Sequence, residues 1–196
     1  MEQAPEKIGV AETGPALSFD EGAMTLLLDV HLDGGAPLWL KHRAQQEGLR
    51  EKSEFHITLI GSKTGKKLLA MLDGVAPKER ARVVQEMRAL FHRFAWASSP
   101  REEYYVISKE YPIKQSPGET ETRRSLVQIV ELPDLVEFYQ GLRQLTGLDE
   151  TLPLAHITLF AGSTLKDNEL RGIGIYSKDQ FEELNPQRVV LDEVES

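Results

Sequence analysis

The chain of 196 residues contains no cysteine and no long apolar run. Without cysteine, neither a disulfide framework nor a thiolate metal site can form. No apolar stretch approaches the roughly 18 residues of a membrane span, so we expect no contact with a membrane. The polar start lacks the basic residues and the apolar stretch of a secretory signal. These absences are typical of a cytoplasmic protein, which is the location we expect.

Positive charge is also scarce, because 23 Lys and Arg face 31 Asp and Glu, for a formal net charge of −8. Binding of long polyanions is driven by counterion release onto Lys and Arg. The sequence therefore disfavours a protein that binds long nucleic acids. A nucleotide or a short RNA end remains a possible substrate, and we expect the protein to be a monomer.

A strand–helix–strand pattern occurs twice in the chain, about 100 residues apart. Each copy has a short apolar run, then a stretch with helical spacing that ends at glycine, then a second apolar run. The first copy spans residues 24–30, 37–49 and 55–60, and the second spans residues 124–130, 134–146 and 154–160. We interpret this repetition as an internal duplication.

The remaining segments add further helices and strands without regular βαβ alternation, which favours an α+β fold. We expect a bilobal pseudo-twofold duplication, with antiparallel sheets lining a central cleft and the helices outside. Residues 1–20 should be a flexible leader, and residues 21–196 a single domain with lobes at about 21–110 and 111–196. The other expected elements are helices at 65–94, broken near Pro77, and at 178–184, strands at 103–111 and 188–191, and a polar loop at 111–122.

The tetrapeptide His-Ile-Thr-Leu begins at His56 and again at His156, in matching places of the two copies. Side chains alternate between the two faces of a strand, so His and Thr two residues apart point the same way. With five histidines and 40% hydrophobic residues, about 0.1 chance matches to such a pattern are expected. Two identical copies therefore indicate a shared function.

Two histidines and two threonines suit the cleavage of a phosphodiester. Histidine titrates near neutral pH, so one imidazole can act as base while the other acts as acid. The hydroxyls of Thr58 and Thr158 can donate hydrogen bonds to phosphate oxygens on which charge develops. We therefore expect His56, Thr58, His156 and Thr158 to be catalytic, and no metal or other cofactor to be needed.

The paired H-x-T-x motifs resemble those of the 2H phosphoesterase superfamily, which includes RNA-ligase-like and cyclic phosphodiesterase members. The resemblance spans about residues 24–191, and RGIGIYSKDQFEEL at 171–184 is similar to a bacterial branch linked to RNA-repair "Swiss army knife" proteins. It implies a bilobal fold and metal-free phosphodiester chemistry, often on 2′,3′-cyclic phosphates or oligonucleotide ends. The catalytic roles carry over to the four motif residues.

Weaker signals concern substrate contacts. Lys63 lies in GSKTGKK, which resembles a phosphate-binding loop but is one residue short and lacks its final Ser or Thr. The segment opens a helix whose N-terminus, with Lys63, Lys66 and Lys67, could hold an anion, and we favour a solvated loop over this substrate contact. Phe160 continues the His/Thr face of its strand by two residues and could stack on a base. Packing in the core explains the same residue at least as well. We interpret Glu150 as a solvated acidic residue.

Asp29, His31 and Asp33 alternate and could share a face that binds a metal. A strand that runs into a polar turn explains the same three residues, and we favour that interpretation. We therefore expect no metal in the site formed by the two motifs.

Three functions fit this sequence. The first is a phosphodiesterase of RNA termini or small 2′,3′-cyclic nucleotides, and the second is a 2′–5′ RNA ligase or 2′–5′ oligonucleotide hydrolase. The third is a non-catalytic nucleotide-binding module, which would not need two acid/base groups. The sequence does not separate the first two.

Overall fold

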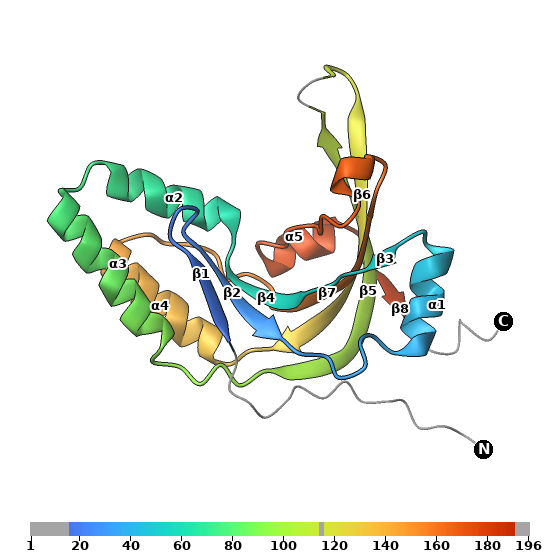
Figure 1. Cartoon of the computed structure of the whole chain (residues 1–196), viewed down its shortest axis with the longest axis horizontal. Helices are drawn as coiled ribbons and strands as arrows, with labels where there is room; N and C mark the ends of the chain where they lie inside the picture. The colour runs from blue at the N-terminus through green and yellow to red at the C-terminus, as the bar shows by residue number, and fades with distance from the viewer. Residues whose placement is uncertain (1–15, 114–115, 191–196) are drawn as a thin grey trace.

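The computed structural model describes residues 16–113 and 116–190 (Figure 1). In these residues it has an α+β fold with one eight-stranded antiparallel sheet and five α-helices. The strands are β1 (Leu17–Asp20), β2 (Thr25–Val30), β3 (Arg50–Glu51), β4 (Phe55–Ile60), β5 (Ser99–Pro112), β6 (Thr120–Glu131), β7 (His156–Ser163) and β8 (Gln187–Val189). The helices are α1 (Leu38–Gln46), α2 (Ser62–Asp73), α3 (Pro77–Phe91), α4 (Asp134–Thr146) and α5 (Lys178–Glu183), with a 3-10 turn at Lys166–Asn168.

The strands follow the order β1-β2-β4-β7-β6-β5-β8, and β3 pairs with β7. At the centre β4 and β7 run antiparallel, with Ile57 opposite Ile157. The expectation of separate sheets is therefore corrected, because this central pairing joins all strands into one sheet. Among the described residues, no helix has the length and apolar character needed to cross a membrane.

The strand pairs on either side of the centre have matching registers. In β2 and β4, Asp29, Leu28, Leu27 and Leu26 lie opposite His56, Ile57, Thr58 and Ile60. In β6 and β7, Ile129, Gln128, Val127 and Leu126 lie opposite His156, Ile157, Thr158 and Phe160. Every pair in the second set differs from the first by 100 in residue number. Both registers shift after the threonine, so Leu59 and Leu159 occupy equivalent β-bulges.

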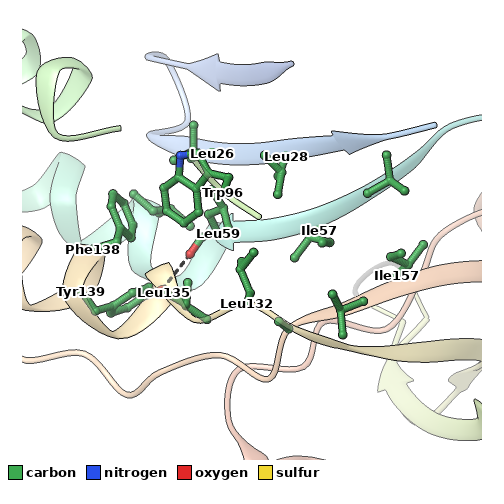
Figure 2. Packing of buried hydrophobic residues seen from close by; sticks show 14 of the residues in the cluster. Leu26, Leu28, Ile57, Leu59, Trp96, Leu132, Leu135, Phe138, Tyr139 and Ile157 are labelled. Atoms are coloured by element: carbon green, nitrogen blue, oxygen red, sulfur yellow. Dashed lines mark hydrogen bonds between the residues drawn. The ribbon is translucent and has the colours of Figure 1, made fainter. Parts of the chain in front are cut away.

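The main hydrophobic core lies on one face of this sheet. Alternation along β2 sends Leu26, Leu28 and Val30 into the core and leaves the intervening side chains on the other face. Helices α3 and α4 pack on the core with a cluster of aromatic rings, and Figure 2 shows Trp96 beside Phe138. Burial of each large apolar side chain contributes about 1.5–3 kcal/mol to the free energy of unfolding. The face of the sheet that carries the main core is therefore held firmly in place.

A smaller core covers part of the opposite face. Ile107 from β5 and Val127 from β6 pack there against Phe181 of α5. Figure 1 shows α5 on the concave side of the curved sheet. The expectation that the helices lie outside the cleft therefore fails for α5, whose single buried aromatic residue anchors it against that face.

Two expected boundaries also change. The expected flexible leader, residues 1–20, lies outside the described residues except at its end, where Leu17–Asp20 form β1 on the edge of the sheet. Leu17 and Phe19 pack against the main core, which fixes this segment. The expected loop at 111–122 is shorter, because β5 and β6 form a long hairpin paired out to Pro112 and Thr120.

Candidate active site

All four motif side chains line one cavity of about 390 Å³ on the concave face of the sheet. The central pairing explains this convergence, because Ile57 and Ile157 point into the main core and their neighbours point the opposite way. Two strands that are adjacent in space thus present two imidazoles and two hydroxyls to the same space. Rigid strands hold all four groups.

His156 is nearly covered, with 8% of its surface exposed. Its Nδ1 lies 2.7 Å from the Leu154 carbonyl oxygen. A carbonyl oxygen only accepts hydrogen bonds, so Nδ1 carries the hydrogen and Nε2 is left for a substrate. Burial lowers the pKa of His156, the bond to Leu154 partly opposes this, and the charge of His56 lowers it further. This environment favours the neutral imidazole.

His56 is less covered and has carboxylates nearby. Burial is the main cause that lowers its pKa, and the charge of Lys52 adds to the effect. Asp29 and Glu54 oppose it and favour the imidazolium. Asp29 lies directly opposite His56 in the sheet, whereas the equivalent partner of His156 is Ile129. The two histidines therefore occupy electrostatically different environments.

One wall of the cavity is a segment without regular secondary structure, residues 172–177, which we call the strap. Gln180 holds the strap by accepting from the Tyr176 N–H at 2.6 Å and donating to the Gly174 carbonyl at 3.2 Å. A Cβ on Gly172 would lie 3.3 Å from Thr158 Oγ1. Glycine therefore lets the strap approach the Thr158 hydroxyl closely.

The start of α2, immediately after β4, forms the opposite wall. This helix lies so close to the β1–β2 turn that a Cβ on Gly65 would be 2.3 Å from the Ala23 carbonyl oxygen. Only glycine fits at that position, and it fixes where the helix begins. Lys63 lines the cavity, with Nζ 5.7 Å from the centre of the Tyr176 ring.

Lys67 also lines the cavity, but it bonds to Glu150 at 2.6 Å. The Thr64 hydroxyl donates to the second oxygen of Glu150 at 3.1 Å. Glu150 is thus part of the cavity wall, which corrects its interpretation as a solvated residue. Because this carboxylate neutralises Lys67, Lys63 is the better placed of the two lysines to meet a substrate anion.

The expectation that Phe160 stacks on a base is wrong. The bulge at Leu159 interrupts the alternation of β7, so Thr158 faces the cavity while Leu159 and Phe160 both enter the main core. Phe160 is 2% exposed. Asp29, His31 and Asp33 do not come together either, because no group of three or more possible metal ligands occurs among the described residues.

The sequence did not single out Tyr176, Gln180 or Tyr139, which also line the cavity. The Tyr139 hydroxyl donates to the Leu59 carbonyl at 2.9 Å, as Figure 2 shows, and so ties α4 to the bulge in β4. The alternating glycines of RGIGIY were a usable signal for the strap, since glycine marks close approach of a backbone.

Comparison with known proteins gives no assignment. No family model, no curated protein and no solved structure matches this chain.

Proposed function

We propose that the protein is a metal-independent phosphodiesterase of the 2H type that acts on RNA termini or small 2′,3′-cyclic nucleotides. One observation carries the proposal: two identical His-Ile-Thr-Leu segments meet at Ile57 and Ile157 and line one cavity with four functional groups. Each imidazole is accompanied by a hydroxyl on the same strand. That set suffices for acid/base catalysis with stabilisation of charge on a phosphate.

The proposal includes a bilobal origin by duplication. Strands β1, β2 and β4 on one side correspond in order to β5, β6 and β7 on the other. The matched registers and the equivalent bulges at Leu59 and Leu159 support the same symmetry. In this interpretation a twofold axis passes near Ile57 and Ile157, and each lobe contributes one half of the catalytic set.

The different environments of the histidines suggest their roles. His156 is neutral with Nε2 unprotonated, so it takes a proton from the attacking water. His56 is the acid in this proposal: burial and Lys52 lower its pKa, but Asp29 and Glu54 favour the imidazolium that gives a proton to the leaving sugar oxygen. As the water oxygen bonds to phosphorus, the bond to the sugar oxygen breaks. Thr58 and Thr158 donate to the non-bridging oxygens.

The cavity suits a small ligand. Its volume of about 390 Å³ lies in the range of pockets that enclose a single small molecule. Lys63 supplies a cation at the wall beside the four catalytic groups. A phosphodiester with one sugar and base beyond the reacting phosphate matches this combination of size and charge.

A substrate panel tests the proposal. It contains 2′,3′-cyclic nucleotides, 2′–5′ and 3′–5′ oligonucleotides, and ADP-ribose cyclic phosphate, assayed with the wild type, His56→Ala and His42→Ala. His42 is an exposed histidine of α1 and serves as the matched control. We expect turnover of at least one cyclic phosphate, lost in His56→Ala and kept in His42→Ala. Turnover of no phosphodiester, or equal turnover by both variants, would contradict the proposal.

A further inference from the structure

The β5–β6 hairpin extends beyond the other strands, as Figure 1 shows, and one of its faces packs against the strap that walls the cavity. Tyr105 and Ile107 of β5 pack in the smaller core beside α5, so they mark the face that carries the cavity. Alternation places Lys109 and Tyr111 on this same face. Glu110, between them, points to the opposite side.

The neighbouring strand adds a guanidinium to this face. Arg123 lies opposite Lys109 in the sheet, and its Cζ is 4.4 Å from the centre of the Tyr111 ring. Lys109 Nζ is 5.4 Å from the same ring. Arg124, one residue on, faces the other way and bonds to Glu47, which follows the last residue of α1. Both cations that contact the Tyr111 ring, Lys109 and Arg123, thus lie on the cavity-bearing face of the hairpin.

A buried carboxylate fixes this arrangement. Arg123 donates to the two oxygens of Glu121 at 2.7 and 2.8 Å, and Ser163 donates to Glu121 at 2.7 Å. The hydrogen bond from Arg123 is the main cause that lowers the pKa of Glu121, to about 2. The carboxylate therefore stays ionised and holds the guanidinium against the Tyr111 ring.

The hairpin face meets the cavity at the strap. The Ile173 N–H of the strap donates to the Ser125 hydroxyl at 3.2 Å. Ser125 lies opposite Ile107, on the same face of β6 as Arg123. Tyr176 of the strap lines the cavity and lies beneath Lys63. Neither Lys63 nor Lys109 forms an ion pair with a carboxylate of the described residues. Each of the two rings, Tyr111 and Tyr176, therefore has at least one cation against it.

We propose that Tyr176, Tyr111, Lys109 and Arg123, which we call the track, bind the nucleotides of a single-stranded RNA beyond the phosphate in the cavity. Unpaired bases stack on aromatic rings, and cations nearby meet the backbone phosphates. Lys109 is the cation that meets a phosphate, whereas Arg123, which Glu121 neutralises, positions the Tyr111 ring. The preferred substrate is then an RNA end rather than a free mononucleotide. This inference rests on the proposed function. Phe160 is buried in the main core, whereas the rings of Tyr111 and Tyr176 are only half-buried and can be reached by a base.

The chemistry of the track explains why the acidic protein can still hold a short strand. Within the described residues, Lys63 and Lys109 are the track-side cations without a carboxylate partner, so the contact covers a few nucleotides and the acidic surface gives long nucleic acids no further gain. Base stacking has no requirement for a particular base, because every base has a π-face. The track therefore selects length and single-strandedness rather than sequence.

The experiment compares two substrates that end in the same 2′,3′-cyclic phosphate, a mononucleotide and a single-stranded hexanucleotide. The wild type is compared with Tyr111→Ala, Tyr111→Phe and Lys109→Ala, and Lys78→Ala on the exposed face of α3 is the lysine control. We expect Tyr111→Ala to lower kcat/KM for the hexanucleotide by about 5- to 150-fold, which corresponds to the loss of one stacked base. Turnover of the mononucleotide should be unchanged, and Tyr111→Phe should retain the wild-type preference.

Binding of a fluorescent hexanucleotide with a free 3′ end, measured by anisotropy, separates the track from catalysis. Lys109→Ala should lower the salt dependence of log K by about 0.7, the contribution of one phosphate contact in a single strand. If Tyr111→Ala and Lys109→Ala both turn over substrate normally and bind the hexanucleotide as the wild type does, the proposed role of the track is wrong and the proposed function stands. Binding that depends on Tyr111, without turnover of any phosphodiester, would instead refute the proposed function alone.

Discussion

Gly172 offers a sharp test of the active-site geometry, because it separates activity from stability. A Cβ at this position would lie 3.3 Å from Thr158 Oγ1 and 3.4 Å from Thr158 Cγ2. Alanine therefore requires a shift of a few tenths of an ångström, whereas the two methyl groups of valine displace either the strap or the threonine. Gly74, where an added Cβ meets nothing within 4 Å, provides the matched control.

The expected magnitudes follow from these contacts. Overpacking costs about 1–3 kcal/mol in a core, and the strap can move outward, so Gly172→Val should lose only about 1 kcal/mol of stability. Displacement of one donor to a developing oxyanion typically costs about 10²–10³-fold in kcat. We expect Gly172→Val to lose activity on this scale, Gly172→Ala to lose less, and Gly74→Val to keep both activity and stability. Urea unfolding and turnover of a 2′,3′-cyclic nucleotide measure the two effects. A folded Gly172→Val variant with wild-type kcat/KM would refute a catalytic role for the Thr158 hydroxyl.

Three further predictions concern pH, packing and metals. Because the pKa of folded His156 is below 6.5, the unfolded chain binds the proton more tightly than the folded protein. The free energy of unfolding is therefore highest above pH 6.5 and falls as the pH decreases through that value. Chemical denaturation at a series of pH values should show a weaker dependence of the unfolding free energy on pH for His156→Asn. Tyr139→Phe leaves the buried Leu59 carbonyl without its 2.9 Å partner and should cost about 0.5–1.5 kcal/mol of unfolding free energy, read from urea midpoints. Treatment with a chelator should leave turnover unchanged, and loss that a specific divalent ion restores would contradict the metal-independent mechanism.

Much of the fold follows from local sequence signals. The two apolar runs and the helix between them form where expected in both halves, because each pattern depends on neighbours along the chain. Pro77 begins α3, where a missing N–H is harmless, and Gly147 ends α4 with a φ of 71°. The alternation within His-Ile-Thr-Leu correctly places both histidines and both threonines on the cavity.

The parts that the sequence did not predict depend on contacts distant in sequence. The burial of Phe160 results from a bulge that appears only when β7 pairs with β6. The place of Glu150 in the wall depends on α2, more than 80 residues earlier in the chain. The contact of the strap with the β5–β6 hairpin, where the Ile173 N–H donates to the Ser125 hydroxyl, likewise requires knowledge of the sheet order.

The central claim is that the two motifs act as one catalytic unit across the β4–β7 pair. The most direct test measures kcat for His56→Ala, His156→Ala and the double variant on the best substrate of the panel. General acid–base steps contribute about 10²–10⁴-fold each, and groups that act together are not additive. We predict that each single variant loses activity on this scale and that the double variant is little worse. If His56→Ala turns over at a near-normal rate while His156→Ala is inactive, the two motifs do not form one catalytic unit.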